Sequence, residues 1–292
     1  MLCKVCKKGT SKLWLKAKKY HIGKCQKCGF AQVLDVPSLN EIYDLYEKLH
    51  VMHLKYRSRS AAIQENSCRL KFLRKYIPAG MRILDAGCAT GDFLAVTDKD
   101  YNVYGSDISS AAIEYTKKRL PHLAQRLKVE KLEDLNYERR EFDAICAWDV
   151  IEHVVHPITV IRRMMDHLKP RGFLLVSTPD FASVMAKIMR SYWAFMIPPY
   201  HLSYFSKRSF EYLFRYRVPG NIISYETRGK TINISFLLYK VHQMKNMLIS
   251  KKILDAVGNS RFGQFKINIF SNDIAYIAVQ KPPVNFPLTV KQ

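Results

Sequence analysis

The sequence predicts an α/β fold in which a doubly wound sheet follows a small cysteine-rich module. Four of the seven cysteines form two CxxC pairs within the first 28 residues, and a strand, a glycine-bearing turn and a helix follow one another after residue 80. The chain of 292 residues, 48% of them apolar, is long enough for a sizeable core and one appendage. We therefore expect a cysteine module over 1–36, a helical connector over 37–77 and the main domain over 78–292.

The four paired cysteines are typical of a metal site. Cys3, Cys6, Cys25 and Cys28 form the two CxxC pairs, whereas the other three cysteines are scattered. In an intracellular chain, this spacing predicts four thiolates around one structural zinc ion, as in a zinc ribbon. Gly29 suits a turn that needs an open backbone angle. The zinc is expected to hold this short module together. A redox CxxC or a chance spacing is the alternative interpretation.

The charge divides the chain into basic ends and a near-neutral middle. Residues 1–80 carry 17 Lys and Arg against 5 Asp and Glu, residues 81–180 carry 14 against 16, and residues 181–292 carry 16 against 4. Basic ends favour nucleic acid or an anionic membrane surface, although many lysines simply solvate a surface. Because no apolar run approaches the ~20 residues that span a bilayer, we expect a soluble, cytoplasmic protein, with peripheral contact with the inner face of the membrane as an option.

A nucleotide-binding unit begins after residue 81. A short apolar strand precedes Asp85, a turn that contains Gly87, Cys88 and Gly91, and then a helix. The next predicted strand ends at Asp107, where the two hydroxyl groups of a ribose could donate hydrogen bonds to one carboxylate. The unit therefore predicts a nucleoside site.

The turn does not suit a dinucleotide. Three residues separate Gly87 from Gly91, so the GxGxxG series is absent. Asp85 stands directly before the turn, where a carboxylate repels a diphosphate and attracts an ammonium or sulfonium group. These features predict an adenosine that carries a cationic amino-acid tail, a description that fits S-adenosylmethionine.

These motifs resemble those of the class I S-adenosylmethionine-dependent methyltransferases. The branch that looks most similar includes the ubiquinone-biosynthesis O-methyltransferases and the methyltransferases of surface-polysaccharide clusters. The resemblance covers about residues 55–282 and implies a Rossmann-like, seven-stranded sheet with one antiparallel edge strand. It rests on the segments LDAGCATG over 84–91, GSDIS over 105–109, FDAI over 142–145 and VIEHV over 150–154, followed by Pro157.

The resemblance also implies which residues hold the cofactor. Gly87, Asp107 and Trp148 should contact it, and Leu132 should lie near the adenine. Together with the turn and the loop after residue 148, the predicted cofactor site comprises Asp85, Gly87, Cys88, Gly91, Asp107, Leu132, Trp148 and Asp149.

Polar residues crowd the loop that follows the predicted strand over 142–148. Asp149, Glu152 and His153 lie there, at the carboxyl end of a strand, where ligands bind in open α/β sheets. His153 could act as general base toward a hydroxyl that attacks the sulfonium methyl, with His201 as a second candidate. Alternatively, the carboxylates and the imidazole could hold a divalent ion such as Mg²⁺ that acidifies the hydroxyl, as the resemblance permits. In a third interpretation, Glu152 and His153 only cap the next helix.

Two segments of the main domain have the pattern of insertions. The first, over 180–205, has apolar residues at helical spacing from Phe181 to Tyr192, with Lys187 and Arg190 opposite them. Such a basic amphipathic helix rests at a membrane interface, covers an active site as a lid, or packs on the core. The second segment, over 229–271, is predicted to be a basic helical element between the last two strands, which are expected over 221–228 and 273–281.

The sequence leaves two classes of acceptor. Basic ends and an apolar lid favour a small-molecule or lipid-linked acceptor that is methylated on a sugar or phenolic hydroxyl. RNA is the alternative, because zinc ribbons are also fused to rRNA base methyltransferases. The segment over 147–150 reads AWDV and lacks the Asn/Asp-Pro-Pro-Tyr/Phe series that grips an exocyclic base amine. We therefore expect the first class.

Overall fold

The computed structural model of the protein describes most of the chain. The middle of the predicted connector over 37–77, with Tyr46, Leu49, Lys55 and Arg57, lies outside the described residues, as does most of the predicted helical element over 229–271. The structure describes residues 1–38, 40–42, 44–45, 59–234, 238, 256–257, 260, 263 and 265–283.

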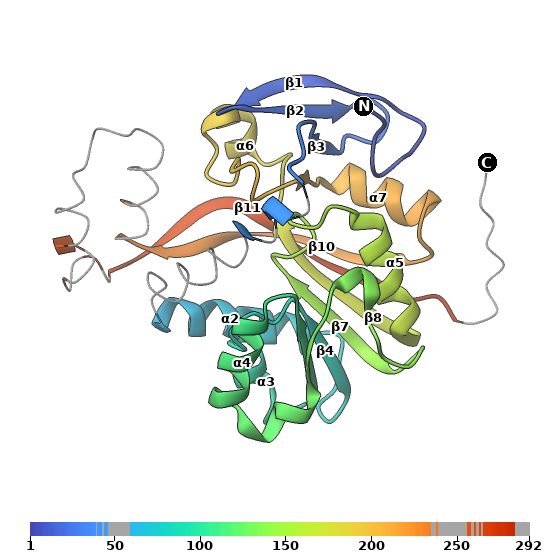
Figure 1. Ribbon diagram of the computed structural model, residues 1–292, viewed down its shortest axis with the longest axis vertical. Coiled ribbons are helices and arrows are strands. Elements are labelled where there is room, and N and C mark those ends of the chain that lie inside the picture. The colour runs from blue at the N-terminus through green and yellow to red at the C-terminus, as the bar shows by residue number, and fades with distance from the viewer. Residues whose placement is uncertain are drawn as a thin grey trace.

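The main domain is built on one seven-stranded sheet, as predicted (Figure 1). The strand order is β10-β11-β8-β7-β4-β5-β6, and the five strands from β8 to β6 run parallel. The strands are β4 (Arg82–Ala86), β5 (Asn102–Asp107), β6 (Leu127–Val129), β7 (Phe142–Trp148), β8 (Leu168–Pro179), β10 (Asn221–Asn233) and β11 (Lys266–Gln280).

The antiparallel strand of this sheet is β11, and it is not at the edge as we expected. It pairs antiparallel with β8 on one side, from Ile274 opposite Pro179 to Gln280 opposite Phe173, and with β10 on the other. β11 therefore lies between β8 and β10, because it pairs with both and leaves β10 as the outer strand.

Three strands are longer than their sequence pattern indicated. β8 begins at Leu168 and includes residues 169–172, whose sequence KPRG is typical of a turn, next to a register shift in its pairing with β7. β10 and β11 extend into the segment that we expected to be helical, where Lys230 pairs with Ile269 and Asn233 with Lys266. Ladder hydrogen bonds between two neighbouring strands stabilise these extensions, which periodicity within one segment cannot reveal.

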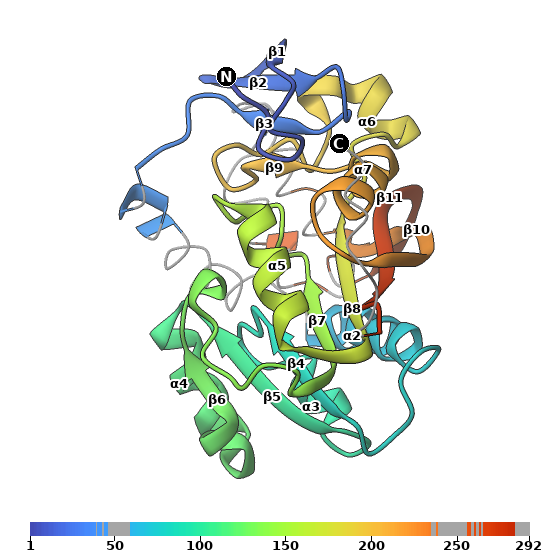
Figure 2. The ribbon, with the colours of Figure 1, turned by 90° about the vertical axis from the view of Figure 1, so that its right-hand side faces the viewer.

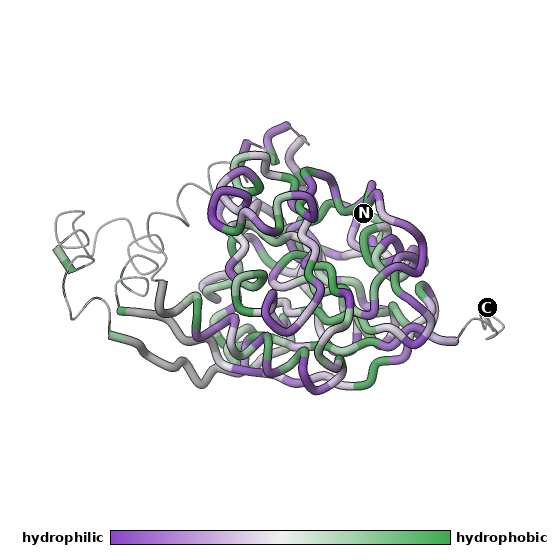
Figure 3. The backbone as a smooth tube through the Cα atoms, turned by 90° about the horizontal axis from the view of Figure 1, so that it is seen from below, coloured by the Kyte–Doolittle hydropathy of each residue, from purple (hydrophilic) through white to green (hydrophobic). Residues whose placement is uncertain are grey.

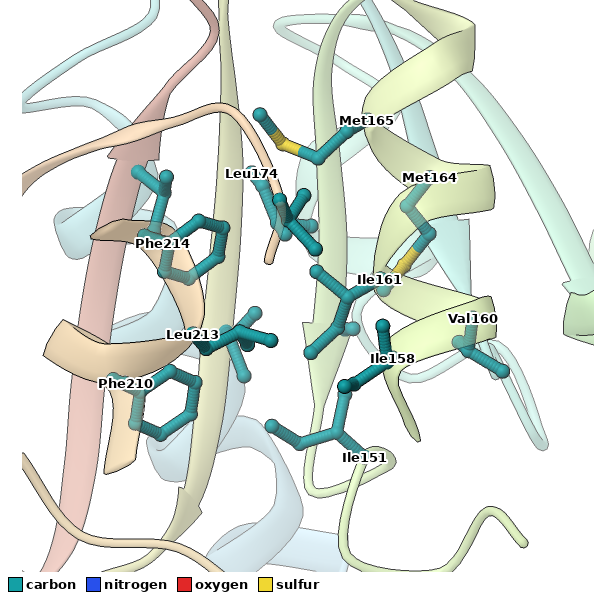
Figure 4. Packing of buried hydrophobic residues seen from close by; sticks show 14 of the residues in the cluster. Ile151, Ile158, Val160, Ile161, Met164, Met165, Leu174, Phe210, Leu213 and Phe214 are labelled. Atoms are coloured by element: carbon teal, nitrogen blue, oxygen red, sulfur yellow. The ribbon is translucent and has the colours of Figure 1, made fainter. Parts of the chain in front are cut away.

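Helices cover both faces of the main sheet. On one face, α2 (Arg59–Leu73), α3 (Leu94–Thr97) and α4 (Ser110–Arg119) pack over the alternate β7 residues Cys146 and Trp148. On the other face, α5 (Pro157–His167) and α7 (Lys207–Tyr216) pack over Ile145 and Ala147. Figure 4 shows Ile161 of α5 and Leu213 of α7 in this second core. Ser109 and Ser206 cap α4 and α7 with their side chains. Two short 3-10 helices, η1 (Pro121–Arg126) and η2 (Leu132–Asp134), flank β6.

The cysteine module forms a second sheet with a strand from the main domain. Its first two strands are β1 (Ser11–Ala17) and β2 (Tyr20–Cys25), and a third, β3 (Ala31–Val33), follows them. β3 also pairs antiparallel with β9 (Ser203–Tyr204), which completes the sheet order β1-β2-β3-β9. Figure 2 shows this sheet at one end of the molecule, next to α6 (Val184–Met189).

Hydrophobic stretches are short along the described chain. Figure 3 shows them alternating with hydrophilic stretches. Among the described residues, no helix combines the length and the apolar character that crossing a membrane would require.

Candidate active site

The turn after β4 has the geometry of a nucleotide-binding loop. Gly87 has φ +83°, and a Cβ atom there would lie 2.6 Å from the Val150 side chain, so the chain bends closely past the next loop. The Asp107 carboxylate at the end of β5 accepts hydrogen bonds from the backbone N–H of Ala89 at 2.8 Å and of Ser109 at 2.9 Å. Asp107 therefore ties the turn to the next strand. Its carboxylate oxygens each have two lone pairs, so two ribose hydroxyls could donate to the same group.

Asp85 lies at the buried end of β4, where its side chain is 3% exposed. Burial raises the pKa of Asp85 to about 7, and Asp107 and Asp92 add to the rise, while the nearby cation of Arg69 opposes it. A carboxylate that is poised near neutrality favours a cationic partner, because such a partner offsets the loss of hydration. This position suits the ammonium group of an amino-acid tail.

Arg69 on α2 is a candidate site residue that the sequence reasoning missed. Its buried guanidinium donates hydrogen bonds to Asp149 at 2.7 Å and to Glu65 at 3.0 Å, and it lies 5.8 Å from the centroid of the Trp148 ring. Burial disfavours the charge, but the carboxylates of Glu65 and Asp149 raise the pKa of Arg69 above its usual value. No signal in the sequence indicated this role, because Arg69 and its partner Asp149 are 80 residues apart.

The loop after β7 starts in a strained conformation. Asp149 has φ +56°, a region that a residue with a side chain seldom adopts and that is common at functional sites. The Ser177 hydroxyl donates to its carboxylate at 2.8 Å and accepts from its backbone N–H at 3.0 Å. The preceding Trp148 packs edge-on against Phe93, at 5.3 Å between ring centroids. Arg69, Trp148 and Asp149 therefore form one cluster at the carboxyl end of β7.

The other predicted cofactor residues are distributed over both faces of the sheet. Cys88 lies in the core under α2 and α3, and burial raises the pKa of its thiol well above the usual range. Leu132 begins η2 and packs in the core on the α5 face, whereas Trp148 packs on the α2 face. Gly91 has φ +72°, and a Cβ atom there would meet the Thr116 side chain at 2.5 Å. The turn, Asp85, Asp107 and the Trp148 loop thus lie at the carboxyl ends of β4, β5 and β7.

Two histidines far apart in the sequence meet beside this loop. The rings of His153 and His201 lie 4.8 Å apart between centroids. His153 Nδ1 lies 2.8 Å from the carbonyl oxygen of Tyr200, and His201 Nδ1 lies 2.8 Å from that of Phe195. Since a carbonyl oxygen can only accept, both Nδ1 atoms carry a proton, and Nε2 is the basic nitrogen of each neutral ring.

Glu152 completes this group. It is 1% exposed, and its carboxylate accepts a hydrogen bond from the Thr178 hydroxyl at 3.0 Å. One ligand atom of each of Glu152, His153 and His201 lies within 4.8 Å of the other two. The residue that caps α5 is His156, without a side-chain hydrogen bond, so Glu152 and His153 do not serve as the cap that we considered. The group is suited to accept a proton or to hold a divalent ion.

The apolar segment after β8 is not one helix. α6 is followed by Arg190 at φ +50° and a 3-10 turn, η3 (Arg190–Tyr192). The apolar residues separate into two sets. Phe181, Trp193 and Met196 are buried against the ribbon, whereas three large side chains are exposed: Val184 (67%), Ile188 (70%) and Tyr192 (61%). One set of apolar residues of this segment therefore packs in the core, and the other set lies at the surface.

The four N-terminal cysteines converge on one point. All four are buried, and their sulfur atoms lie within 4.8 Å of one another, with 3.5 Å between Cys3 and Cys28 and between Cys6 and Cys25. A tetrahedral zinc ion with Zn–S bonds of about 2.3 Å needs sulfur atoms roughly 3.8 Å apart, so the cluster fits zinc. The hydrogen bond with Cys28 lowers the pKa of Cys3, which favours a thiolate.

Neighbouring residues support the cysteine turns. The backbone N–H of Gly9 points at the Cys6 sulfur at 3.2 Å, and Gly29 adopts φ +75°, as predicted. His21 of the ribbon could compete with the cysteines as a zinc ligand. Its Nδ1 atom instead lies 2.7 Å from the carboxylate of Asp35.

Comparison with known proteins identifies relatives of the central part of the chain. A family model described as "Methyltransferase domain" matches residues 56–217. The ubiquinone biosynthesis O-methyltransferase of Bradyrhizobium diazoefficiens is 31% identical over 145 residues, which cover 47% of this chain and 56% of that protein. The protein of the same name from Xylella fastidiosa is 33% identical over 120 residues, which cover 39% and 48%. The chain thus spans about half the length of these curated relatives.

Solved structures share the fold at low sequence identity. A SAM-dependent methyltransferase from Archaeoglobus fulgidus superposes with a TM-score of 0.54 at 14% identity, covering 79% of this chain and 98% of that one. The YcgJ protein from Bacillus subtilis superposes with a TM-score of 0.54 at 14% identity, covering 73% and 97%. At this identity the likeness bears on the fold alone, and it confirms the predicted fold class.

Proposed function

Because the chain belongs to the methyltransferase-domain family, we propose that it is an S-adenosylmethionine-dependent methyltransferase and that it methylates a hydroxyl group of a small or lipid-linked phenol or sugar. The observation that carries this proposal is the pair His153 and His201, whose basic Nε2 atoms belong to rings 4.8 Å apart beside the loop after β7. A hydroxyl needs a base before it can attack a methyl group at neutral pH. The ubiquinone biosynthesis O-methyltransferases among the relatives favour the same acceptor atom.

Each charged residue of the cofactor site would bind a different part of the cofactor. Asp107 would accept hydrogen bonds from the ribose hydroxyls, and Asp85 would pair with the ammonium group of the amino-acid tail. The guanidinium of Arg69, buried beside Asp149 and Trp148, would pair with the carboxylate of that tail. When bound, the cofactor supplies a methyl group on a sulfonium, which is electrophilic without further activation.

The acceptor side would be served by the two histidines and Glu152. His153 is partly exposed and His201 is buried, so His153 is better placed to take the acceptor proton. As the new O–CH₃ bond forms and the S–CH₃ bond breaks, the hydroxyl proton would move to Nε2 of His153. The Nδ1–H of His153 donates to the carbonyl oxygen of Tyr200, and the buried carboxylate of Glu152 would stabilise the imidazolium that results.

A divalent ion is a second candidate for activating the hydroxyl. Glu152, His153 and His201 offer two imidazoles and one carboxylate, a set that suits Mn²⁺, Fe²⁺ or Zn²⁺ better than Mg²⁺, which prefers oxygen ligands. Turnover after exhaustive chelation, followed by addition of Mg²⁺ or Mn²⁺, separates the two mechanisms. Recovery only with a metal would favour the ion, and unchanged turnover would favour the base.

We also propose structural zinc at Cys3, Cys6, Cys25 and Cys28. The buried, convergent sulfur atoms support this assignment. Elemental analysis should find one zinc per chain that is lost when Cys25 is replaced by serine. Purified protein without zinc but with a protease-resistant N-terminus would contradict it.

The proposed acceptor lies at an anionic membrane surface. The ribbon over 1–36 contains nine Lys and one Asp, and the exposed apolar residues of α6 and η3 lie beside Lys187 and Arg190. A stripe of aliphatic side chains with flanking cations suits a lipid headgroup region. RNA binding would instead use a positively charged groove with aromatic rings on which bases stack. RNA is therefore the alternative partner.

Transfer of labelled methyl groups tests the proposal directly. The protein is incubated with labelled S-adenosylmethionine and either a total lipid extract, which includes lipid-linked glycans and quinone precursors, or total RNA. Label should enter the lipid fraction in an alkali-stable ether and should fall when His153 is replaced by glutamine. Label in RNA alone would overturn the proposed acceptor while leaving the methyltransferase assignment intact.

A further inference from the structure

The ribbon sheet is joined by hydrogen bonds to the segment that carries His201. Gln32 of β3 pairs with Ser203 of β9, and the backbone N–H of Val33 donates to the carbonyl oxygen of Leu202 at 3.1 Å. On its other side, this segment is bonded to the loop after β7. The N–H groups of Leu202 and Ser203 both donate to the carbonyl oxygen of Glu152, at 2.8 and 3.0 Å. The backbone that leads out of His201 thus lies between the ribbon and the catalytic loop.

Side chains of the ribbon enclose the same segment. Leu202 and Tyr204 are fully or nearly fully buried, in one cluster with Ile22 and Val33 of the ribbon. Trp14 of β1 packs edge-on against Phe181, which lies at the start of the segment, with 4.8 Å between ring centroids. The ribbon therefore provides a wall of the core that holds residues 181–204.

After α6 and η3, the described residues of this segment form turns and the short strand β9. β9 has two residues, and its strand partner in the described part of the chain is β3. The side chain of His201 bonds to Phe195, which belongs to the same segment. A segment with few internal ladder bonds keeps one conformation only if its neighbours fix it.

The cysteine cluster lies next to β3 along the chain. The N–H of Cys25 donates to the carbonyl oxygen of Phe30 at 2.8 Å, and the N–H of Gly29 donates to that of Cys25 at 3.0 Å. Arg208 of α7 donates to the carbonyl oxygen of Lys27 at 2.8 Å, which anchors the turn to the main domain. The conformation of this turn decides where β3 begins.

We propose that the four-cysteine ribbon is a positioning element of the active site: through β3 and β9 it fixes His201 and, through the carbonyl of Glu152, the His153 loop. This inference rests on the proposed roles of the two histidines. It assigns the ribbon a part in acceptor chemistry beyond holding its own residues together. The cofactor end should be indifferent to it, because Asp107 is held by Ala89 and Ser109.

The imidazole resonances of the full chain provide a test that needs no acceptor. Carbon–proton NMR spectra of selectively labelled histidines are recorded before and after zinc removal with a chelator, and assignments come from His153→Gln and His201→Gln. Signals of His153 and His201 should shift or broaden beyond detection. The internal control is His167, which is also buried and also bonded to backbone carbonyls, at 3.0 and 3.2 Å, but lies on α5.

A second arm avoids metals, because Glu152 and the two histidines could themselves lose an ion to the chelator. Val33→Pro removes the N–H that bonds to Leu202 and leaves all four cysteines in place. The matched control is Val36→Pro, at a partly buried residue just after β3 whose backbone N–H donates no hydrogen bond within the described part of the chain. Val33→Pro should change the His201 and His153 signals and retain zinc, and Val36→Pro should change neither.

Measuring cofactor affinity distinguishes a specific effect on the two histidines from unfolding of the whole protein. S-Adenosylhomocysteine, used as the probe, should bind the zinc-free protein and the Val33→Pro variant within about twofold of the unaltered protein. If the His201 signal, the His167 signal and probe binding are all lost, the inference is overturned, because the ribbon would then only stabilise the whole fold. Unchanged His201 signals in both arms would also overturn it. If no hydroxyl acceptor is ever methylated, the proposed function fails, but the NMR result still decides the positioning.

Discussion

The Arg69 guanidinium and the Asp149 carboxylate form an ion pair of 2.7 Å that joins α2 to the strained loop after β7. Arg69 precedes β4 along the chain and Asp149 follows β7, and the guanidinium lies 5.8 Å from the centroid of the Trp148 ring. Asp149 leads directly to Glu152 and His153, so the cation that we assign to the cofactor tail also orders the loop that would perform the chemistry. Cofactor binding and acceptor activation are therefore linked through one buried side chain.

Replacing Arg69 tests this link. Arg69→Met should destabilise the protein by about 3 kcal/mol, the lower end for a buried ion pair, because it leaves the partly buried carboxylates of Asp149 and Glu65 without their cation. It should also weaken cofactor binding. Thermal or denaturant unfolding and calorimetry measure the two effects. Arg74→Met, which removes an exposed ion pair with Asp100 on the same chain segment, is the matched control and should change little. Equal effects of the two substitutions would contradict the assignment.

Replacing His153 tests the proposed base. His153→Gln should lower methyl transfer by about 10²–10⁴-fold, the usual contribution of a general base, with cofactor affinity unchanged. Turnover with labelled S-adenosylmethionine and calorimetry give the two quantities. His122→Gln, which alters an exposed histidine paired with Asp98, should leave both unchanged. Full turnover in His153→Gln would exclude His153 as the base.

Replacing Asp107 tests the ribose site. Asp107→Ala removes the acceptor for both ribose hydroxyls and for two loop amides, so S-adenosylmethionine affinity should fall at least about a hundredfold. Hydrogen bonds to a charged group contribute about 1.5–3 kcal/mol each, and about 1.4 kcal/mol is a factor of ten. Titration calorimetry measures the loss. An unchanged affinity would disprove the placement of the cofactor.

The pKa of Asp85 predicts how cofactor binding depends on pH. With the pKa of this carboxyl raised to about 7 by burial, binding a cation below pH 7 requires release of a proton. Affinity should therefore rise by up to about tenfold per pH unit as pH increases toward 7, and then level off. In the unbound protein, stability should fall as pH rises from about 4 to 7, because the folded state keeps a proton that the unfolded carboxyl releases. Asp85→Asn should flatten both profiles, and a pH-independent affinity in the unaltered protein would refute the pairing.

The exposed stripe of α6 and η3 predicts membrane binding. Ile188→Ser should weaken binding to anionic vesicles at low and at high salt, because Ile188 is 70% exposed and contributes apolar area. Lys187→Glu should act only through the part of binding that salt screens. Vesicle sedimentation at two salt concentrations distinguishes them. Ile223→Ser, at an exposed apolar residue on β10, is the control. Binding to structured RNA but not to vesicles would contradict the membrane proposal and favour RNA as the partner.

Much of the cofactor end could be predicted because its signals are local. The strand, the turn with Gly87 and the carboxylate of Asp107 follow one another within one βαβ unit, and each residue type has a steric or electrostatic reason. The cysteine spacing was equally informative. His201 was a candidate because its segment was expected to face the same end of the sheet as the loop after residue 148, although its distance from His153 could not be known.

The remaining features depend on contacts between distant segments. The pairing of β3 with β9 joins two short strands, neither of which has enough residues to show a period of two. The role of Arg69 depends on Asp149, and a single cation in a helix carries no sign of its partner. In the segment after β8, the periodic pattern was real, but Arg190 ends α6 early and divides the apolar residues between core and surface.

The pairing of Ala31 with Tyr204 also sets the order of events during synthesis. The N-terminal module leaves the ribosome first, yet the last strand of its sheet is translated much later. At about 5–20 residues per second, the exposed edge of β3 waits roughly 10–35 s for its partner. An unpaired strand edge invites wrong partners during that interval. Early closure of the cysteine cluster, or a chaperone, would protect this edge from aggregation during that interval.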